Sequence, residues 1–342
     1  AIPRMINMTQ DEKLIHEIPF APLRGSSGNR MFCVTRQRLL MSLYHAAERA
    51  GCEFVTNSHV VRATPDGEIE TESGARYRGD IVVGADGVNS KVRDSLGLCK
   101  ARIKNRDGAI RVLVDHIPGR TDNSRWRNLL EWFSDSRRIL YSPCEGNQFY
   151  LCLSAQHRDS RGSKTPLDKE SWSNSFPTIR DVIARIDGPQ RYDVYETIKT
   201  DTWSKGKVAI VGDAAHSMPP GLGQGCGIGI TNGLSLAKML TTFGATAEAL
   251  AKWEARNREM TEHTQYWSTI SWPMSQWPLW AIKMFYEFPL WSEWVRERRS
   301  RTASFAAFGN ESLPRWLPPG ASVDSAAPSP PKPEIIVPHP LA

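Results

Sequence analysis

The chain has 342 residues, of which 40% are hydrophobic, and a net charge of +6 at neutral pH. This length allows one large or two ordinary domains with a sizeable core. Basic residues form short local clusters, so nucleic-acid binding is only a weak second interpretation, and the dispersed cysteines and histidines give little support for a metal site. We expect reduced thiols and a cytoplasmic location.

The N-terminal part of the chain predicts a helix followed by short strands. Thr35 can cap the helix and Gly51 can end it, with apolar residues on one face: Leu39, Leu43, Ala47 and Ala50. Residues 54–61 and 68–71 are predicted as strands on either side of the turn 65–67. This small meander leads into a buried strand at 81–83.

The segment 80–93 combines that buried strand with a Gly/Asp turn and a polar, basic stretch. Its turn contains Asp86 and Gly87, and Ser90 and Arg93 follow. Taken alone, Asp86-Gly87 is typical of an ordinary turn. Arg36, at the start of the first helix, would by itself indicate a solvated residue or a surface ion pair.

The middle of the chain predicts a mixed or antiparallel sheet. Its strands are expected at 110–114, 128–133, 138–141 and 149–153, and a helix is expected over 168–186. Trp132 and Tyr141 lie on these strands and are candidates for a substrate pocket. Core packing explains them equally well.

The segment 206–229 carries the clearest chemical pattern. An apolar strand, 208–211, meets Gly212-Asp213-Ala214, then a glycine-rich loop, and then an amphipathic helix at 228–240. Glycines allow a backbone to approach a ligand closely, and free N–H groups at a helix start favour an anionic or electron-rich group. Asp213 could accept hydrogen bonds from ligand hydroxyls.

The C-terminal part predicts a helix at 246–267 with ion pairs at i,i+4 spacing, Glu248–Lys252 and Glu254–Arg258. Six tryptophans follow within 267–294. They allow a peripheral membrane contact, but we favour short helices that cap the preceding domain with buried indoles, because the region has no apolar span of about 20 residues. Residues 318–342, rich in proline, predict a disordered tail.

In this order, three of these segments resemble the FAD-dependent aromatic hydroxylases, the p-hydroxybenzoate hydroxylase-like or group A flavoprotein monooxygenases. They are the helix at 34–43, the Asp86-Gly87 segment and the Gly212-Asp213 segment with its loop. The resemblance implies that Arg36 reaches the FAD phosphates and that Ser90 and Arg93 shape the turn and the approach of the nicotinamide nucleotide. It also implies the remaining FAD contacts: Asp86 and Gly87 near the phosphate and ribose, Gly212, Asp213 and Ala214 at the ribityl chain, and Pro220, Gly223, Gln224 and Gly225 along the isoalloxazine.

The same resemblance implies an α/β fold with α+β elements. An FAD-binding Rossmann-like domain would comprise 1–107 and 205–317, with C-terminal helices, and a mixed or antiparallel substrate-binding sheet domain, 108–204, would be inserted between them. The implied activity is hydroxylation of an aromatic or heteroaromatic molecule with NADH or NADPH and O₂, through a flavin C4a-hydroperoxide, with Pro220 as the catalytic position. Phenols, indoles and pyridines all remain open as substrates.

Several features limit this hypothesis. The sequence has no Gly-x-Gly-x-x-Gly, so we expect an incomplete FAD-binding domain, an N-terminally truncated chain, and weak or no FAD binding by this chain alone. A non-catalytic remnant or partner-binding protein is the alternative. His216 could be a base, although a structural role is favoured. Asn232 stands where many members have an acidic residue. An asparagine at this position is similar to a subgroup of the family that acts on pyridine-type rings.

Overall fold

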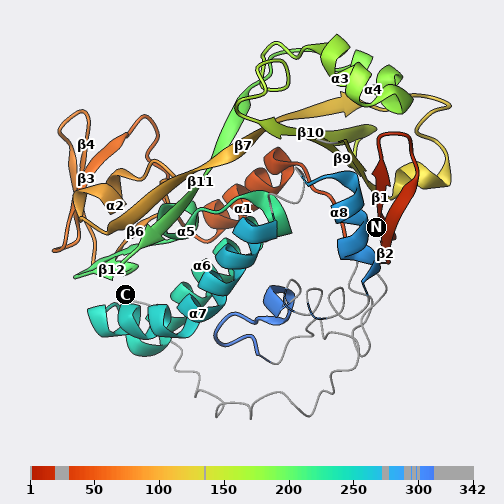
Figure 1. Ribbon diagram of the computed structural model, residues 1–342. Coiled ribbons are helices and arrows are strands. Elements are labelled where there is room, and N and C mark those ends of the chain that lie inside the picture. The colour runs from red at the N-terminus through yellow and green to blue at the C-terminus, as the bar shows by residue number, and fades with distance from the viewer. Residues whose placement is uncertain are drawn as a thin grey trace.

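The computed structural model describes residues 2–19, 31–134, 136–271, 277–288, 294, 298 and 301–311. Its largest element is a seven-stranded sheet with the order β11-β7-β10-β9-β8-β1-β2 (Figure 1). The strands are β1 Arg4–Thr9, β2 Leu14–Pro19, β7 Cys99–Asp115, β8 Leu129–Phe133, β9 Arg137–Pro143, β10 Gln148–Gln156 and β11 Tyr192–Thr200. Neighbours run antiparallel except β1 and β8, which are parallel. The sheet expected in the middle of the chain is present and also includes two N-terminal strands.

The division of the chain at 107/108 stays a prediction. In the structure, β7 runs without interruption through these residues, and β1 pairs with β8 in the same sheet. Strand membership therefore groups residues 4–19 with the large sheet, although the sequence assigned them to the FAD-binding part.

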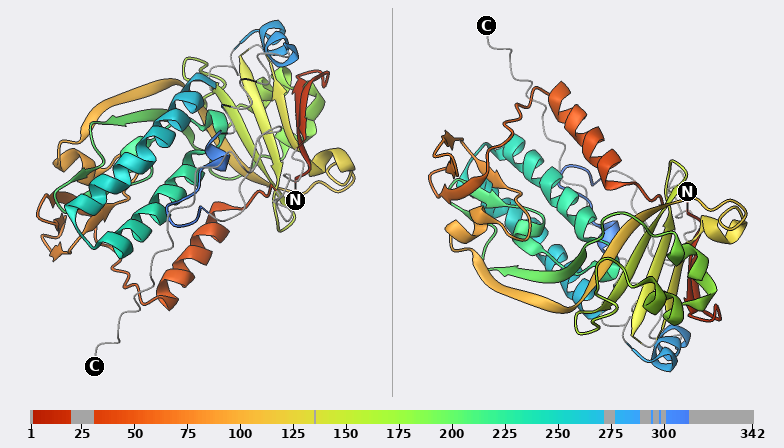
Figure 2. Two further views of the ribbon diagram at one scale, coloured as in Figure 1. Left: turned by 90° about the horizontal axis from the view of Figure 1, so that it is seen from below. Right: turned by 90° about the horizontal axis from the view of Figure 1, so that it is seen from above.

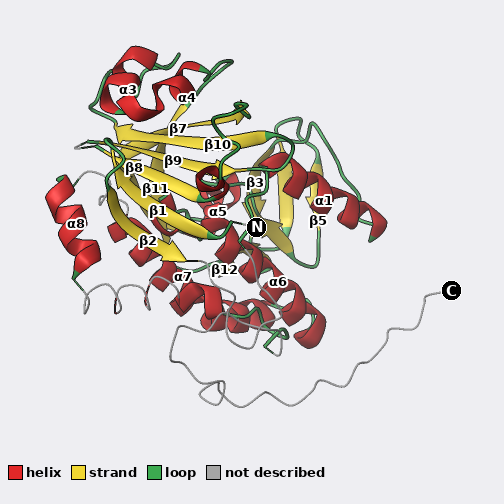
Figure 3. Cartoon of the chain, turned by 90° about the vertical axis from the view of Figure 1, so that its right-hand side faces the viewer, coloured by secondary structure: helices red, strands yellow, loops and turns green. Residues whose placement is uncertain are grey.

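One face of the large sheet is covered by the short helices α3 Lys169–Ser175 and α4 Arg180–Ala184 (Figure 3). Trp172 and Phe176 are completely buried there against sheet residues such as Leu130 and Ile139. The single helix expected over 168–186 is wrong. A 3-10 turn, Pro177–Ile179, separates α3 from α4, because Pro177 cannot donate the backbone hydrogen bond that a continuous helix needs.

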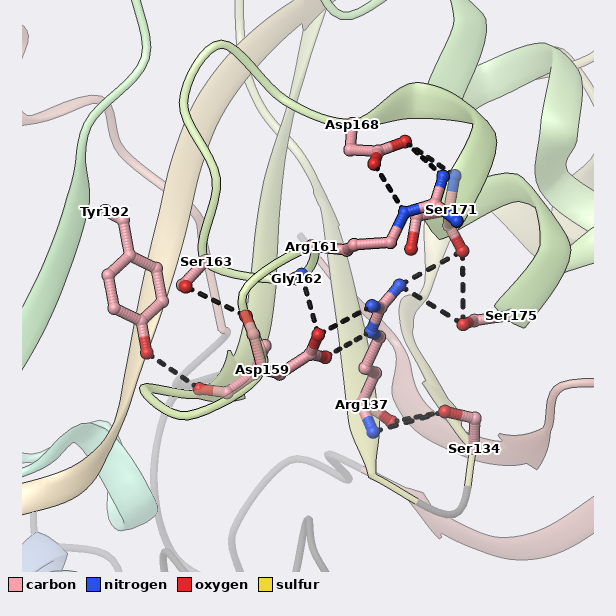
Figure 4. A network of polar contacts seen from close by, with 11 residues as sticks. Ser134, Arg137, Asp159, Arg161, Gly162, Ser163, Asp168, Ser171, Ser175 and Tyr192 are labelled. Atoms are coloured by element: carbon pink, nitrogen blue, oxygen red, sulfur yellow. Dashed lines mark hydrogen bonds and ion pairs between the residues drawn. The ribbon is translucent and has the colours of Figure 1, made fainter.

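A polar network fastens α3 and the loop before it to the sheet (Figure 4). The Arg137 guanidinium donates to both carboxylate oxygens of Asp159, at 2.7 and 2.9 Å, and to the Ser171 carbonyl at 3.0 Å. Arg137 also lies over the Trp172 ring, 4.9 Å from its centre. Burial alone would raise the pKa of the Asp159 carboxyl group. The hydrogen bonds from Arg137 and from backbone N–H groups outweigh this effect, so the pKa is lowered. The network supplements the apolar core with charge-assisted hydrogen bonds.

The rest of the fold, called here the cofactor half, contains two small sheets and the long helices. The sheets have the orders β12-β13-β6 and β3-β4-β5. The strands are β3 Val60–Thr64, β4 Glu68–Thr71, β5 Arg76–Arg78, β6 Val82–Gly84, β12 Ser204–Lys205 and β13 Val208–Ile210, and the helices are α2 Lys91–Ser95, α5 Asp213–His216, α6 Gly225–Phe243 and α7 Ala247–Ser271. A strand is present where the buried strand was expected at 81–83, but its burial is wrong, since Ile81 and Val82 are only partly buried and Val83 is exposed. The strand expected over 54–61 begins only at Val60.

Helix α1, Arg36–Arg49, confirms the first predicted helix, but none of its residues is buried. Its apolar side chains, including Leu39, Leu40 and Leu43, are exposed. The expected apolar pattern is therefore present, but the described residues leave this apolar face of α1 exposed. Figure 2 shows α1 on the outside of the cofactor half, with α6 between α1 and α7.

The tryptophan-rich region only partly follows the prediction. Helix α8, Leu279–Glu287, packs through Ile282 on Ile15 and Phe133 of the large sheet, not on the cofactor half. Trp267 is buried, but Trp277, Trp280 and Trp294 are exposed, so the expected burial of all the indoles is wrong. Trp272, Trp291 and the predicted tail 318–342 lie outside the described residues. None of the described helices has the length and hydrophobicity needed to cross a bilayer.

Candidate functional site

The Gly212-Asp213 pair lies where buried strand β13 meets the short helix α5. The strand is held against β6, where the Val211 N–H donates to the Gly84 carbonyl at 3.0 Å. Gly212 has φ +59° and ψ −139°, a conformation that other residues rarely adopt. A Cβ at this position would point into open space. The turn thus requires glycine because of its backbone angles, and it leaves free space beside the chain.

Arg36 and Asp213 come from distant segments and lie close enough for their charges to interact. Asp213 is partly exposed. The protein atoms that surround the rest of its carboxyl group remove water from it and thereby raise its pKa. The positive charge of Arg36 acts in the opposite direction. The start of α1 and the start of α5 therefore present a cation and an anion at one surface, which suits a ligand that has both phosphates and hydroxyls.

The Asp86-Gly87 turn is adjacent to β6 and leads into α2. One carboxylate oxygen of Asp86 accepts from the Ser90 hydroxyl at 2.5 Å, and the other accepts from the Val92 N–H at 3.1 Å. Gly87 has φ +79° with open space at the Cβ position. Asp86 thus holds the N-terminus of α2 in the structure, and the predicted contacts of Asp86 and Gly87 with FAD stay predictions.

Arg93 connects this turn to the Gly-Asp motif. Its side chain is completely buried and donates to the carbonyls of Val88, at 3.0 Å, and Ala214, at 3.2 Å. A buried guanidinium does not itself contact a ligand at the surface, so the effect of Arg93 on the approach of the nicotinamide nucleotide stays a prediction. In the structure Arg93 fixes the position of α5 relative to α2, which agrees with its predicted role in shaping the turn.

The glycine-rich loop is anchored at Ser217, just before it begins. The Ser217 hydroxyl donates to the Glu196 carbonyl of β11 at 2.8 Å, and its own carbonyl accepts from the Ile198 N–H and from the Gln265 amide at 3.1 and 2.9 Å. Both β11 and α7 therefore hold the base of the loop. This attachment brings the loop beside the large sheet.

Beyond this anchor, the loop forms a short turn and then starts helix α6. Pro220 begins the turn, Pro220–Leu222, and Gly223 ends it with φ +65°. Gln224 precedes α6, whose first residue is Gly225. The first N–H groups of a helix have no intrahelical partners, so the loop residues Gly223, Gln224 and Gly225 lie at a position suited to an electron-rich ligand edge. Helix α6 lies beside Gly212 at Gly229, where an added Cβ would make an ordinary van der Waals contact with the Gly212 Cα at 3.5 Å.

His216 and Asn232 belong to a buried network between α5, α6 and α7. The Asn232 amide donates to His216 Nε2 at 3.1 Å and to the Thr261 hydroxyl at 3.0 Å, and the Trp253 indole donates to the Asn232 carbonyl at 2.9 Å. Burial lowers the pKa of His216 to about 4, so its ring is neutral at pH 7. The geometry agrees with the favoured structural role of His216. Asn232 is also fully buried in this network and is a poor guide to the substrate.

A polar patch on the face of the large sheet opposite α3 and α4 was missed by the sequence analysis. It consists of Arg111, Tyr150, Cys152, Asp193 and Tyr195, and we call it the sheet patch. Arg111 pairs with Asp193 at 2.8 Å and lies 5.7 Å from the centre of the Tyr195 ring. Burial, with the nearby Cys152, raises the pKa of both phenols, so each stays a neutral hydroxyl at pH 7. The alternation of polar and apolar residues along 149–153 is the signal that could have revealed it.

The same alternation places the predicted pocket residues on the other face. Trp132 and Tyr141 are buried in the core beneath α3 and α4, and the Tyr141 hydroxyl donates to the Trp126 carbonyl at 3.0 Å. Neither residue faces the sheet patch, so the pocket interpretation is corrected in favour of core packing. Glu131 of β8 and Arg138 of β9 point to the opposite side, toward the sheet patch, and form a buried ion pair.

Comparisons with known proteins agree with these motifs. Residues 5–264 match the family model described as an FAD binding domain. The chain is 38% identical over 265 residues to a probable 2-heptyl-3-hydroxy-4(1H)-quinolone synthase, AqdB2, of Rhodococcus erythropolis, a match that covers 73% of this chain and 69% of the relative. The tetrameric 2-methyl-3-hydroxypyridine-5-carboxylic acid oxygenase superposes with a TM-score of 0.73 at 34% identity, over 88% of this chain and 80% of that one.

A more distant structure supports the fold alone. The HpxO protein of Klebsiella pneumoniae, determined with FAD and uric acid, has a TM-score of 0.68 at 20% identity and covers 87% of this chain and 76% of that one. The family model and the relatives above 30% identity decide the family. The chain belongs to the FAD-dependent aromatic hydroxylases, which are flavoprotein monooxygenases.

Proposed function

We propose that this protein hydroxylates a heteroaromatic small molecule, using FAD, O₂ and NADH or NADPH, and that the substrate ring lies between the glycine loop and the sheet patch. One observation carries the proposal. Ser217, at the base of the loop, is hydrogen-bonded to Glu196, the residue after Tyr195 in β11. The segment expected beside the isoalloxazine and the patch with two phenols are thus attached to each other. We also propose that the protein is cytoplasmic, because NAD(P)H is available in the cytoplasm.

The residues present fit parts of FAD. The free space beside Gly212 and Gly223 and the paired charges of Arg36 and Asp213 suit the ribityl chain and a phosphate. The start of α6 suits the electron-rich edge of the isoalloxazine. When bound, FAD supplies the redox chemistry that activates O₂ for transfer of one oxygen atom.

The protein's own contribution is orientation and the exclusion of water. Tyr150 can donate a hydrogen bond to an oxygen or nitrogen on the substrate ring, since its hydroxyl stays protonated, whereas the Tyr195 hydroxyl is buried behind it in the sheet patch. Pro220 restrains the backbone of the loop on the opposite side. Such placement keeps the ring within reach of the oxygen that is transferred.

The relatives narrow the substrate class. One is described as a quinolone synthase and the other as an oxygenase of a hydroxypyridine carboxylic acid. Both names contain a nitrogen heterocycle with an oxygen substituent, and the Tyr150 phenol donor is well suited to such a group. We therefore propose hydroxylated pyridines or quinolones as substrates, ahead of simple phenols or indoles.

The test measures NADH and NADPH oxidation by the FAD-loaded protein with a panel of hydroxypyridines, quinolones, phenols and indoles. We expect faster oxidation with a nitrogen heterocycle, and one atom of ¹⁸O₂ in the product. Pro220→Gly should keep NAD(P)H consumption but release more H₂O₂ and less product, because the loop is loosened without loss of an ionisable group. Product oxygen that derives from water would exclude a monooxygenase, and no response to any aromatic compound would favour a non-catalytic protein.

A further inference from the structure

Two cysteines from distant segments form a close pair at the boundary between the two halves. The sulfur atoms of Cys33 and Cys144 are 3.3 Å apart, and both residues are partly buried. Cys33 lies just before α1, and Cys144 begins the turn between β9 and β10. Arg38 of α1 and Glu145 of the same turn form an ion pair beside them.

The spacing is short enough for a covalent bond after a small movement. A disulfide requires a sulfur–sulfur distance of about 2 Å, so the two sulfur atoms must approach by roughly 1 Å. The turn is positioned by its own backbone, since Gly146 and Asn147 have φ +79° and +62°. The other four cysteines have no such thiol neighbour among the described residues.

We propose that Cys33 and Cys144 form a redox-active dithiol, which hydrogen peroxide converts to a reversible disulfide that ties the start of α1 to the β9–β10 turn. The Cys33 sulfur attacks one peroxide oxygen, the O–O bond breaks, and one water leaves, which gives a sulfenic acid. The Cys144 sulfur then attacks the Cys33 sulfur, and the hydroxyl group leaves as a second water. The two thiols lose two electrons, and the peroxide is reduced to two waters.

The surroundings assign the order of these steps. Burial and the neighbouring Cys33 raise the pKa of Cys144, so Cys144 stays a thiol at neutral pH. The reactive form of cysteine is the thiolate, so the raised pKa makes Cys144 the poorer nucleophile, and we assign the first step to Cys33. Peroxide is the by-product expected when a flavin monooxygenase consumes O₂ without hydroxylating its substrate. This source of peroxide rests on the proposed function, whereas the proposed disulfide rests on the geometry of the two thiols.

The disulfide would act on the segment that carries Arg36. Helix α1 has no buried residue, and the thiol pair and the Arg38–Glu145 ion pair are its side-chain links to the β9–β10 turn among the described residues. Oxidation would add a covalent restraint three positions before Arg36. The redox state of the pair would therefore determine how firmly the start of α1 is held.

The test treats the full chain with a small excess of added H₂O₂, so that it does not require the proposed hydroxylase activity. After tryptic digestion we expect the peptide 31–36 joined to the peptide 139–158, lighter than the sum of the two by about 2 Da and separated by dithiothreitol. Fragmentation must place the bond on Cys144 and not on Cys152. The oxidised chain should also unfold at a temperature higher by on the order of 5 °C.

Two variants test the order of the steps. Cys144→Ser should trap a sulfenic acid at Cys33, which dimedone labels, whereas Cys33→Ser should leave Cys144 unlabelled. Cys226→Ser, at an exposed position, serves as the matched control and should leave the disulfide unchanged. Recovery of peptides 31–36 and 139–158 as separate species after peroxide treatment would overturn the proposal, and so would cross-links formed only through Cys52, Cys99 or Cys226.

Discussion

The short helices of the large sheet and helix α1 of the cofactor half differ in how they are held. In the large sheet, α3 and α4 bury Trp172, Phe176 and Ile183 completely against the strands. In the cofactor half, α1 buries no residue, and Leu40 and Leu43 are exposed. The first arrangement is stabilised by its own core, whereas the second leaves α1 dependent on polar and thiol contacts. Substitutions in the sheet core should therefore change stability, and substitutions of Arg36 and Asp213, at the starts of α1 and α5, should change cofactor binding.

The largest expected effect is on the stability of the sheet half. Arg137→Ala removes both hydrogen bonds to Asp159 and the contact with Trp172, and leaves a partly buried carboxylate unpaired. Loss of one partner from such a pair costs about 3 kcal/mol of unfolding free energy. Urea unfolding measures this change, and the exposed pair of Arg161 with Asp168 in the same network gives the control. Arg161→Ala should have a much smaller effect, and equal effects would contradict the assigned role of Arg137.

The second prediction concerns the pH dependence of stability. Burial lowers the pKa of His216 to about 4, from 6.5 in the unfolded chain. Above pH 6.5 both states hold a neutral ring, so the group has no effect on stability. Between pH 6.5 and 4 the unfolded chain takes up a proton that the folded chain refuses, and stability falls as the pH falls, by about 3 kcal/mol in total.

The variant His216→Gln isolates this contribution. Glutamine retains hydrogen-bonding capacity toward Asn232 but does not titrate, so the difference in unfolding free energy between the two proteins should change over pH 4–6.5 and stay constant above it. Chemical unfolding at several pH values measures the difference. A difference that stays constant over the whole range would mean that His216 takes up its proton over the same pH range in the folded and the unfolded protein.

The third prediction concerns cofactor affinity. Asp213→Ala and Arg36→Ala should each weaken FAD binding by roughly ten- to a hundredfold, because a charge-assisted hydrogen bond contributes about 1.5–3 kcal/mol. Arg38→Ala, on the same helix but paired with Glu145, is the matched control and should bind FAD normally. Flavin fluorescence titration gives the three dissociation constants. If all three variants bind alike, the site at α1 and α5 is wrongly assigned.

The sequence predicted best the elements whose pattern is local. The strands at 128–133, 138–141 and 149–153 and the helix at 246–267 are present because alternation and i,i+4 spacing specify them without help from the rest of the chain. The single helix expected over 168–186 is wrong because Pro177 interrupts the backbone hydrogen bonds, although the residues on both sides of it are helical. The strand expected from residue 54 failed because only residues from Val60 onward find a partner strand.

What the sequence could not supply was the contact between distant segments. The pairing of β1 with β8, the side of the sheet on which α8 packs, and the burial of Arg93 between two motifs all depend on tertiary structure. The pocket was misassigned for a similar reason. Periodicity shows that Tyr141 and Tyr150 lie on opposite faces of the sheet, but not which face α3 and α4 cover.

The smallest expected effect follows from this difference between the faces. Tyr141→Phe removes one buried hydrogen bond, to the Trp126 carbonyl, and should lower the unfolding free energy by about 1 kcal/mol without changing KM for the aromatic substrate. Tyr150→Phe makes the same chemical change on the face of the sheet patch. It should leave stability nearly unchanged but raise KM or increase the release of H₂O₂, because the substrate ring loses a hydrogen-bond donor. Steady-state kinetics and thermal unfolding of the two variants separate the roles. If Tyr141→Phe alone changed the kinetics, the substrate would have to lie on the face that α3 and α4 cover.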